Sequence, residues 1–108
     1  MEIEIVADGS VIGRSVLDRL DPSMGCALGQ FTPTPSYHPQ THASDIDGET
    51  NRPSSRMKLR VRTVTGETIE ALDVCILDFS NGLGPTGLEV DVIGIPREVF
   101  ERYFGPGA

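Results

Sequence analysis

The chain has 108 residues, of which 38% are hydrophobic, and its 16 acidic and 9 basic residues give a formal net charge of −7. This length predicts a single domain over residues 1–108 with one modest core. The sequence has no run of about 18 apolar residues and no basic head before an apolar run, so we expect neither a membrane span nor a secretory signal. A strongly acidic chain is also repelled by nucleic-acid phosphates and by anionic membranes, unless one face is locally basic.

Two cysteines, Cys26 and Cys75, lie in apolar, strand-like segments. A chain without an export signal is expected in the cytoplasm, where thiols stay reduced, so we expect two buried free thiols. A single disulfide is the alternative if the protein is exported by another route. Two such distant cysteines do not form a zinc-binding framework, and neither has a histidine beside it that would indicate a nucleophile.

The first part of the chain is predicted to be built of strands. Residues 2–7 alternate between polar and apolar types, an Asp-Gly turn pair follows, and apolar residues then resume, which predicts a hairpin over 2–14. Residues 15–20 carry apolar residues at helical spacing and predict a short turn of helix or an irregular strand. Residues 23–32 predict a buried strand whose two glycines allow a bulge or the close approach of another backbone segment.

Residues 33–56 form the most distinctive tract, with prolines at four positions among many Ser, Thr, Asn and Asp residues. Proline supplies no backbone donor and the other residue types favour turns, so we expect no regular element here. A loop of about twenty residues inside a small domain is usually either functional or disordered.

Residues 57–64 alternate strictly and predict the clearest strand of the chain. We expect this strand to form a hairpin with a second one over 67–79, which would be irregular near 71–73. In that pairing, Glu67 and Glu70 would match the basic face of the first strand. That basic face consists of Lys58, Arg60 and Arg62.

After a glycine-rich connector, residues 88–95 predict a third strand of this sheet and residues 96–104 predict a helix. A proline suits the start of the helix and Gly105 suits its C-terminal cap. We expect an ion pair between Glu98 and Arg102 on the outer face. The apolar face, which should dock on the sheet, consists of Val99, Phe100, Tyr103 and Phe104.

Together, these elements predict an α+β fold that is mainly antiparallel β. Five or six strands would form one curved sheet or a small open barrel, with the C-terminal helix packed on it. The long loop would separate an N-terminal hairpin layer from a C-terminal β-meander.

Gly82, Gly84 and Gly87 match the G-x-G-x-x-G pattern of dinucleotide-binding loops. That site needs a helix after the glycines, but a strand is predicted there, and no basic residue lies nearby. We therefore interpret the glycines as a flexible connector and expect no cofactor.

The 36–49 loop contains imidazole and carboxylate groups, which are ligands of transition metals. A single loop without a rigid partner makes a poor metal cage, so a solvated polar loop is the simpler interpretation. The candidate metal ligands are His38, His42, Asp45 and Asp47.

Asp78 follows the strongest apolar run of the chain. A carboxylate beside a core strand is either an acid with a raised pKa or a cap for the next turn, here near Asn81-Gly82. We favour the cap, and the sequence assigns no catalytic residue.

Phe31 and Tyr37 bracket Pro33 and Pro35 in a stiff, extended segment. Such a segment loses little entropy on docking and therefore suits contact with a protein partner. The alternative is that the two aromatic rings cover an edge of the sheet in their own domain, and this intramolecular interpretation is favoured because a small domain needs its aromatics for its core.

Arg60 and Arg62 are further candidates for partner binding, because they lie on the basic face of a predicted strand. Nucleic-acid-binding sheets add stacking aromatic rings to such a basic stripe, and this stripe has none.

The sequence thus leaves three classes of function open. The favoured one is a small, soluble, non-catalytic interaction module that binds another protein, or itself as a homodimer, through the loop 33–56 or a sheet edge. The alternative is a small-ligand or metal-binding protein or enzyme with its site in the 36–49 loop. The second alternative is a nucleic-acid binder that uses the basic strand 56–62.

Overall fold

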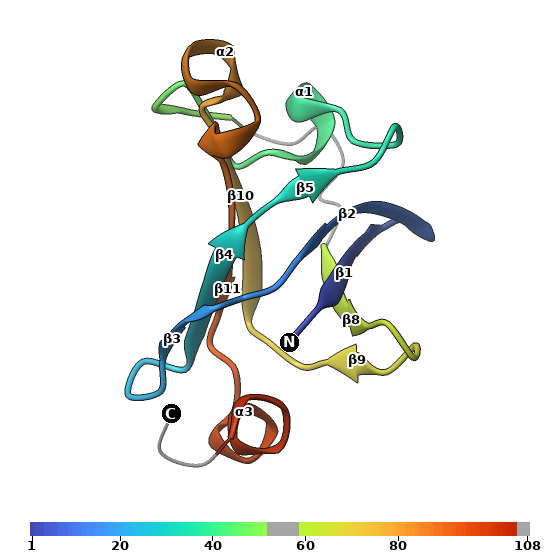
Figure 1. The fold of residues 1–108 in the computed structure, drawn as a ribbon, viewed down its shortest axis with the longest axis vertical. Coiled ribbons are helices and arrows are strands. Elements are labelled where there is room, and N and C mark those ends of the chain that lie inside the picture. The colour runs from blue at the N-terminus through green and yellow to red at the C-terminus, as the bar shows by residue number, and fades with distance from the viewer. Residues whose placement is uncertain (52–58, 106–108) are drawn as a thin grey trace.

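The structure is a computed structural model that describes residues 1–51 and 59–105. Its strands form two open, mainly antiparallel sheets, and a short helix follows the last strand (Figure 1). The predicted fold class, β-rich α+β with a C-terminal helix, is therefore confirmed. The strands are shared between two sheets, one of five strands and one of six.

The five-stranded sheet has the strand order β5-β2-β1-β8-β9. Its strands are β1 (Ile3–Ala7), β2 (Ser10–Ser15), β5 (Thr32–Pro33), β8 (Arg60–Thr63) and β9 (Thr68–Ile69). The six-stranded sheet has the order β3-β4-β11-β10-β6-β7. Its strands are β3 (Arg19–Asp21), β4 (Cys26–Gln30), β6 (Asp45–Ile46), β7 (Glu49–Thr50), β10 (Asp73–Asp78) and β11 (Leu88–Ile93).

The remaining elements are short. They are α1 (Pro39–His42), α2 (Ser80–Leu83), the 3-10 turn Gly84–Gly87 and α3 (Arg97–Phe104). None of the helices in the described part of the chain is long and apolar enough to cross a membrane.

The N-terminal hairpin is confirmed, because β1 and β2 pair around a turn in which Asp8 (φ 50°) and Gly9 (φ 82°) are both left-handed. The helical alternative for 15–20 is wrong, and the irregular strand is right. The chain crosses there from one sheet to the other, with Val16 exposed and Leu17 buried at a left-handed φ of 50°. Burial of Leu17 in the core outweighs the weak helical spacing.

The predicted close approach at a glycine is confirmed at Gly29 in β4. A Cβ atom there would lie 2.5 Å from Ser15 Oγ and 2.8 Å from Leu17 N, so the crossing segment rests directly on the Gly29 backbone. Gly25 instead lies in the turn before β4 at φ 65°, which is why the strand begins at Cys26 and not at residue 23.

The expectation of no regular element in 33–56 is wrong for the described residues. Short elements β5, α1, β6 and β7 occur there, and β6 pairs in parallel with β10. The Asn51 amide donates hydrogen bonds to the carbonyl oxygens of Pro39, Gln40 and Ala43 and so ties the segment together. Residues 52–56 of the predicted loop lie outside the described residues.

The predicted hairpin between 57–64 and 67–79 is confirmed only for β8 and β9. Beyond β9 the chain leaves this sheet, and β10 joins the six-stranded one. The irregularity that was predicted near residues 71–73 is the point at which the chain crosses from one sheet to the other. The charge match with Glu67 and Glu70 is wrong for Arg62, whose guanidinium binds Glu4 of β1 at 2.8 Å. Lys58 and Met57 lie outside the described residues.

β11 pairs with β10, as expected of the third strand, and also with β4. Helix α3 follows, with Phe100 buried and Gly105 as its C-terminal cap at φ 92°. Its ion pair joins Arg97 to Glu101 at 3.2 Å and not Glu98 to Arg102, although the spacing of four residues is the same.

The predicted separation into an N-terminal layer and a C-terminal layer is wrong. β1 pairs with β8 in one sheet, and β4 pairs with β11 in the other, so each sheet joins early and late segments. The buried side chains form one core cluster to which both sheets contribute. In Figure 1, α2 lies at one end of the six-stranded sheet and α3 at the other.

Candidate functional site

The two candidate histidines lie together on α1 and the residue before it. His42 Nδ1 accepts a hydrogen bond from the backbone N–H of His38 at 3.0 Å, and the two rings are 6.2 Å apart. His42 is buried, and burial, followed by the nearby His38, lowers its pKa. The neutral ring therefore carries its proton on Nε2.

A polar pocket of about 400 Å³ lies between this segment and the β1–β2 turn. Its polar lining residues are Asp8, Ser10, Ser36, His38, Thr41 and His42. The candidate ligands Asp45 and Asp47 are not part of it, and the Asp47 carboxylate accepts a hydrogen bond from Asn81 at 2.7 Å. Within residues 1–51 and 59–105, no three side chains of the ligating types come together as a metal site.

The aromatic segment turns its rings inward. Phe31 has no exposed surface, and Tyr37 packs edge-on against it with ring centres 5.1 Å apart. Pro33 and Pro35 between them are exposed. Because Phe31 is inaccessible, it offers no surface to a partner in this conformation. The two rings pack within their own domain, as the intramolecular interpretation predicts.

Asp78 is buried and serves as an internal acceptor. Its carboxylate accepts hydrogen bonds from Tyr37 Oη at 2.6 Å, Ser80 N at 2.9 Å and Ser80 Oγ at 2.5 Å. Burial pushes the pKa of Asp78 up, but these hydrogen bonds together hold it below its usual value. The pKa of Asp78 is therefore lowered and not raised, and its carboxylate binds Ser80 at the start of α2 instead of capping the turn at Asn81-Gly82.

The basic strand is partly neutralised. Arg62 makes two hydrogen bonds to Glu4 Oε1, at 2.8 and 3.1 Å, and Arg14 lies 3.7 Å from the other oxygen of the same carboxylate. Arg60 is exposed. Arg56 lies outside the described residues, as does Lys58.

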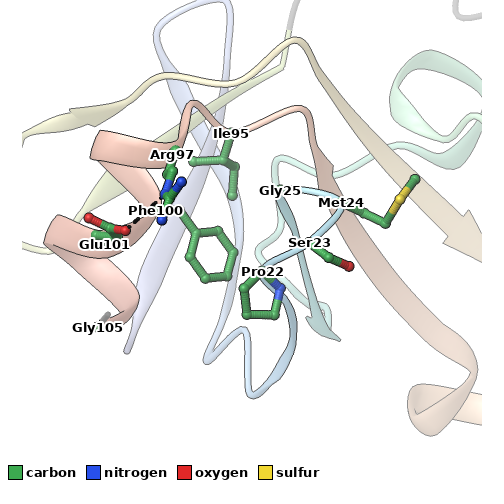
Figure 2. Close-up of a pocket in the computed structure, with 9 residues that line it drawn as sticks. All are labelled: Pro22, Ser23, Met24, Gly25, Ile95, Arg97, Phe100, Glu101 and Gly105. Atoms are coloured by element: carbon green, nitrogen blue, oxygen red, sulfur yellow. Dashed lines mark hydrogen bonds and ion pairs between the residues drawn. The ribbon is translucent and has the colours of Figure 1, made fainter. Parts of the chain in front are cut away.

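A groove of about 500 Å³ lies between the β3–β4 turn and α3, a place that the sequence analysis did not single out (Figure 2). Figure 2 shows the Phe100 ring reaching from α3 towards the turn, while Met24 points away from the helix. The Arg97–Glu101 ion pair lies on the helix beside the groove. Phe100 is 3% exposed, so the ring closes the end of the core and leaves little apolar surface to a ligand.

The six-stranded sheet has one face against the core and one face outward. In β11, Val90 and Val92 are fully buried, so the alternating side chains point the other way. Figure 1 shows the five-stranded sheet on one side only, and none of the described helices lies over the other side. We call this outward surface the open face; its side chains on the three central strands include Cys26, Leu28, Cys75, Leu77, Glu89, Asp91 and Ile93.

Asp91 lies in the middle of the open face. Its register partners are Leu28 on β4 and Cys75 on β10, and Glu89 follows two residues away on the same side of β11. Its Oδ1 atom is buried and has no hydrogen-bond partner among the described residues. Burial, followed by a hydrogen bond with Glu89, raises the pKa of Asp91 to about 7.

The pKa of Glu89 is shifted in the opposite direction, below its usual value. The hydrogen bond from Asp91 lowers its pKa most, and the guanidinium of Arg19, 2.5 Å away, lowers it further. Of the two carboxyl groups, Asp91 therefore holds the proton. The sequence signal for this pair was the presence of two acidic residues among the apolar residues of a predicted strand. The sequence did not show that this strand would be central in its sheet.

Both cysteines are free, as expected, although each is only partly buried. They belong to the open face and lie on either side of β11. Burial raises the pKa of the Cys75 thiol, so this group stays protonated and unreactive at neutral pH.

Comparison with protein-family models, with curated proteins and with solved structures finds no match to this chain.

Proposed function

We propose that the protein is a small, non-catalytic interaction module that pairs with a second copy of itself through the open face. The observation that carries this proposal is the apolar centre of the open face, where Leu28 and Leu77 are half-buried and Ile93 is exposed. A surface of this kind is typical of interfaces, which combine an apolar centre with a few polar groups that the partner completes.

The charges of the open face favour a second copy over other occupants. Arg19 lies on β3 at one side of the sheet, where it binds Glu89 and shares the strand with Asp21, whereas Asp45 and Asp73 lie on β6 and β10 at the other side. β11 is the middle strand of the five from β3 to β6. A two-fold axis along β11 therefore brings the arginine side of each copy over the acidic side of the other.

Both free cysteines lie on this face, which supports action in a reducing compartment such as the cytoplasm. The alternative candidate regions support a partner less well. Phe31 is enclosed in the core, and Arg62 is neutralised by Glu4 within its own sheet.

Sedimentation velocity from micromolar to millimolar protein, at about pH 6, tests the proposal. We expect a reversible monomer–dimer equilibrium. Leu28→Arg and Leu77→Arg each place a charge in the centre of the face and should weaken the dimer at least tenfold, which corresponds to about 1.4 kcal/mol. Circular dichroism should show that both variants remain folded, because the two side chains point away from the core.

Leu83→Arg is the matched control, because Leu83 is an exposed leucine on α2 and lies outside the open face. It should leave the dimer unchanged. A wild-type protein that stays monomeric over the whole concentration range overturns the proposal, and so does an equal loss of affinity in Leu83→Arg.

A further inference from the structure

We infer that the polar pocket between α1 and the β1–β2 turn binds a neutral polyhydroxyl compound of the size of a monosaccharide. His42 donates a hydrogen bond to this ligand, and Asp8 accepts one from it. The inference goes beyond the proposed function and does not depend on it, because the pocket lies outside the open face and is formed within one copy of the chain.

The donor is the ring of His42, which is only 6% exposed and lines the pocket. Its Nδ1 atom already accepts the backbone N–H of His38 at 3.0 Å, so the neutral ring carries its proton on Nε2. This Nε2–H makes no hydrogen bond to the described residues. Among those residues, Asp91 Oδ1 is the only fully enclosed side-chain atom without a partner, so Nε2 has accessible surface and is free to donate to a ligand.

Neighbouring rings hold this donor in place. The rings of Tyr37 and His38 stack with that of His42 at centroid distances of 5.9 and 6.2 Å. Tyr37 is itself fixed, because its hydroxyl donates to Asp78 at 2.6 Å. A ring that is held on its faces and at Nδ1 loses little freedom when its remaining N–H binds a ligand.

The acceptor comes from the opposite wall of the pocket, the β1–β2 turn. Asp8 is exposed there at a φ of 50°, and its carboxylate has no hydrogen-bond or ion-pair partner among the described residues. The two walls are joined directly, since the Thr34 hydroxyl donates to Val11 O at 2.6 Å and the Thr34 N–H donates to Ile12 O at 2.9 Å. The pocket is therefore preformed, as small-molecule sites usually are.

The polar lining of the pocket decides the class of ligand. Its other polar side chains are those of Ser10, Ser36, Thr41 and His38. No lysine or arginine is among the described residues that line it, so an anion such as phosphate would meet the Asp8 carboxylate without a strong cation to balance it. An ammonium group would offer no acceptor to the Nε2–H of His42. A hydroxyl group both donates and accepts, and therefore suits both walls.

The apolar lining and the size of the pocket agree with this class. Ala7, Ile12 and Pro35 supply carbon surface on which the C–H groups of a sugar ring can pack. The volume of about 400 Å³ lies within the range of small-molecule sites and accommodates a monosaccharide.

The experiment is an NMR titration of the backbone amides of the full chain with D-glucose, D-galactose and myo-inositol, each up to about 100 mM. At least one of these compounds should shift the amides of Gly9, Ser36 and Thr41 and reach saturation. Inorganic phosphate and methylammonium, titrated in the same way, should not.

Two variants test the assigned roles. Asp8→Asn removes the charge and keeps a residue that tolerates the left-handed turn, and it should weaken binding at least about tenfold. His42→Asn keeps an amide oxygen near the place of Nδ1 but removes Nε2, and it should weaken binding to a similar extent. Asp47→Asn is the matched control, because Asp47 is an exposed aspartate at a φ of 53°, followed by Gly48 and outside the pocket, and its affinity should equal that of the wild type.

Three outcomes overturn the inference. They are the absence of saturable shifts with all three polyhydroxyl compounds, binding that Asp8→Asn leaves unchanged, and saturation of the same amides by phosphate or methylammonium instead. If His42→Asn does not fold, the imidazole nitrogen spectrum of the wild type decides the role of His42. The Nε2–H signal should move when the compound binds, and an unchanged signal overturns that role.

Discussion

Two aspartates on opposite faces of the six-stranded sheet differ in what surrounds them. Asp78, on the core side, is 3% exposed and accepts three hydrogen bonds from Tyr37 and Ser80. Asp91, on the open face, keeps one oxygen without a partner among the described residues. The pKa of the first lies below its usual value and the pKa of the second lies well above it.

Burial raises the pKa of both groups, so burial is not what separates them. The difference comes from the donors that the chain itself provides. A carboxylate with donors in its own chain stabilises the fold, whereas a carboxylate with a buried oxygen that lacks a donor costs free energy when it is charged. The four predictions below test this contrast between the two faces.

The largest contrast is expected between neighbours on β10. Ile76 is fully buried on the core side, so Ile76→Ala should lower the free energy of unfolding by about 2–5 kcal/mol. Leu77→Ala removes a similar volume from the open face and should cost less than about 1 kcal/mol in the monomer. Urea unfolding at low protein concentration measures both, and equal losses would contradict the assignment of the two faces.

The next effect concerns the hydrogen bonds that the Asp78 carboxylate accepts. Tyr37→Phe removes one hydrogen bond to a charged acceptor and should lower the free energy of unfolding by about 1.5–3 kcal/mol at neutral pH. Because the folded pKa of Asp78 is depressed, its contribution is present above the ordinary Asp pKa and is lost as the pH falls through the folded value. The variant should therefore lose less stability in acid than the wild type does, which urea unfolding below about pH 4 would reveal.

A third prediction tests the close approach of the crossing segment near Leu17 to Gly29 in β4. Gly29→Ala forces a Cβ atom towards the backbone of Leu17 and should cost about 1–3 kcal/mol. Gly82→Ala is the matched control, because nothing lies within 4 Å of a Cβ atom there, and in α2 it should be neutral or slightly stabilising. Thermal unfolding of the two variants side by side gives the comparison, and similar midpoints would argue against the close approach.

The smallest expected effect is the change in the stability of the monomer with pH that arises from Asp91. A raised folded pKa means that the contribution to stability is present below the ordinary Asp pKa and is lost as the pH rises through about 7. The part lost should be of the order of 1 kcal/mol, since solvent screens a partly exposed group. Asp91→Asn should flatten this part of the pH profile of unfolding, measured at concentrations too low for the dimer, and a profile identical to that of the wild type would contradict the raised pKa.

Much of the fold could be predicted from local pattern. The β1–β2 hairpin, the alternation of β8 and β11, and the capped helix α3 all follow from period-2 or turn signals that act over a few residues. The predictions failed at the two crossings, near Leu17 and near Leu72, where the chain changes sheets. Those changes depend on which distant strand offers a better partner, and no local period records that choice.

The candidate site was less predictable for the same reason. The carboxylate pair at Glu89 and Asp91 is visible in the sequence as the polar half of an alternating strand. Its meaning depends on β4 and β10 flanking it, and β4 lies about sixty residues earlier in the chain. The histidines show the converse, since His38 and His42 are near in sequence and meet, but Asp45 and Asp47 do not join them.

The strand order has one consequence for how the protein is made. β11 comes after every other described strand in the chain, yet it is a central strand of its sheet and bonds to β4 and β10 on its two sides. During synthesis, β4 emerges from the ribosome long before the strand that will cover its edge. The six-stranded sheet can therefore close only after residue 93 has left the exit tunnel, and until then a chaperone that shields β4 would meet an open strand edge.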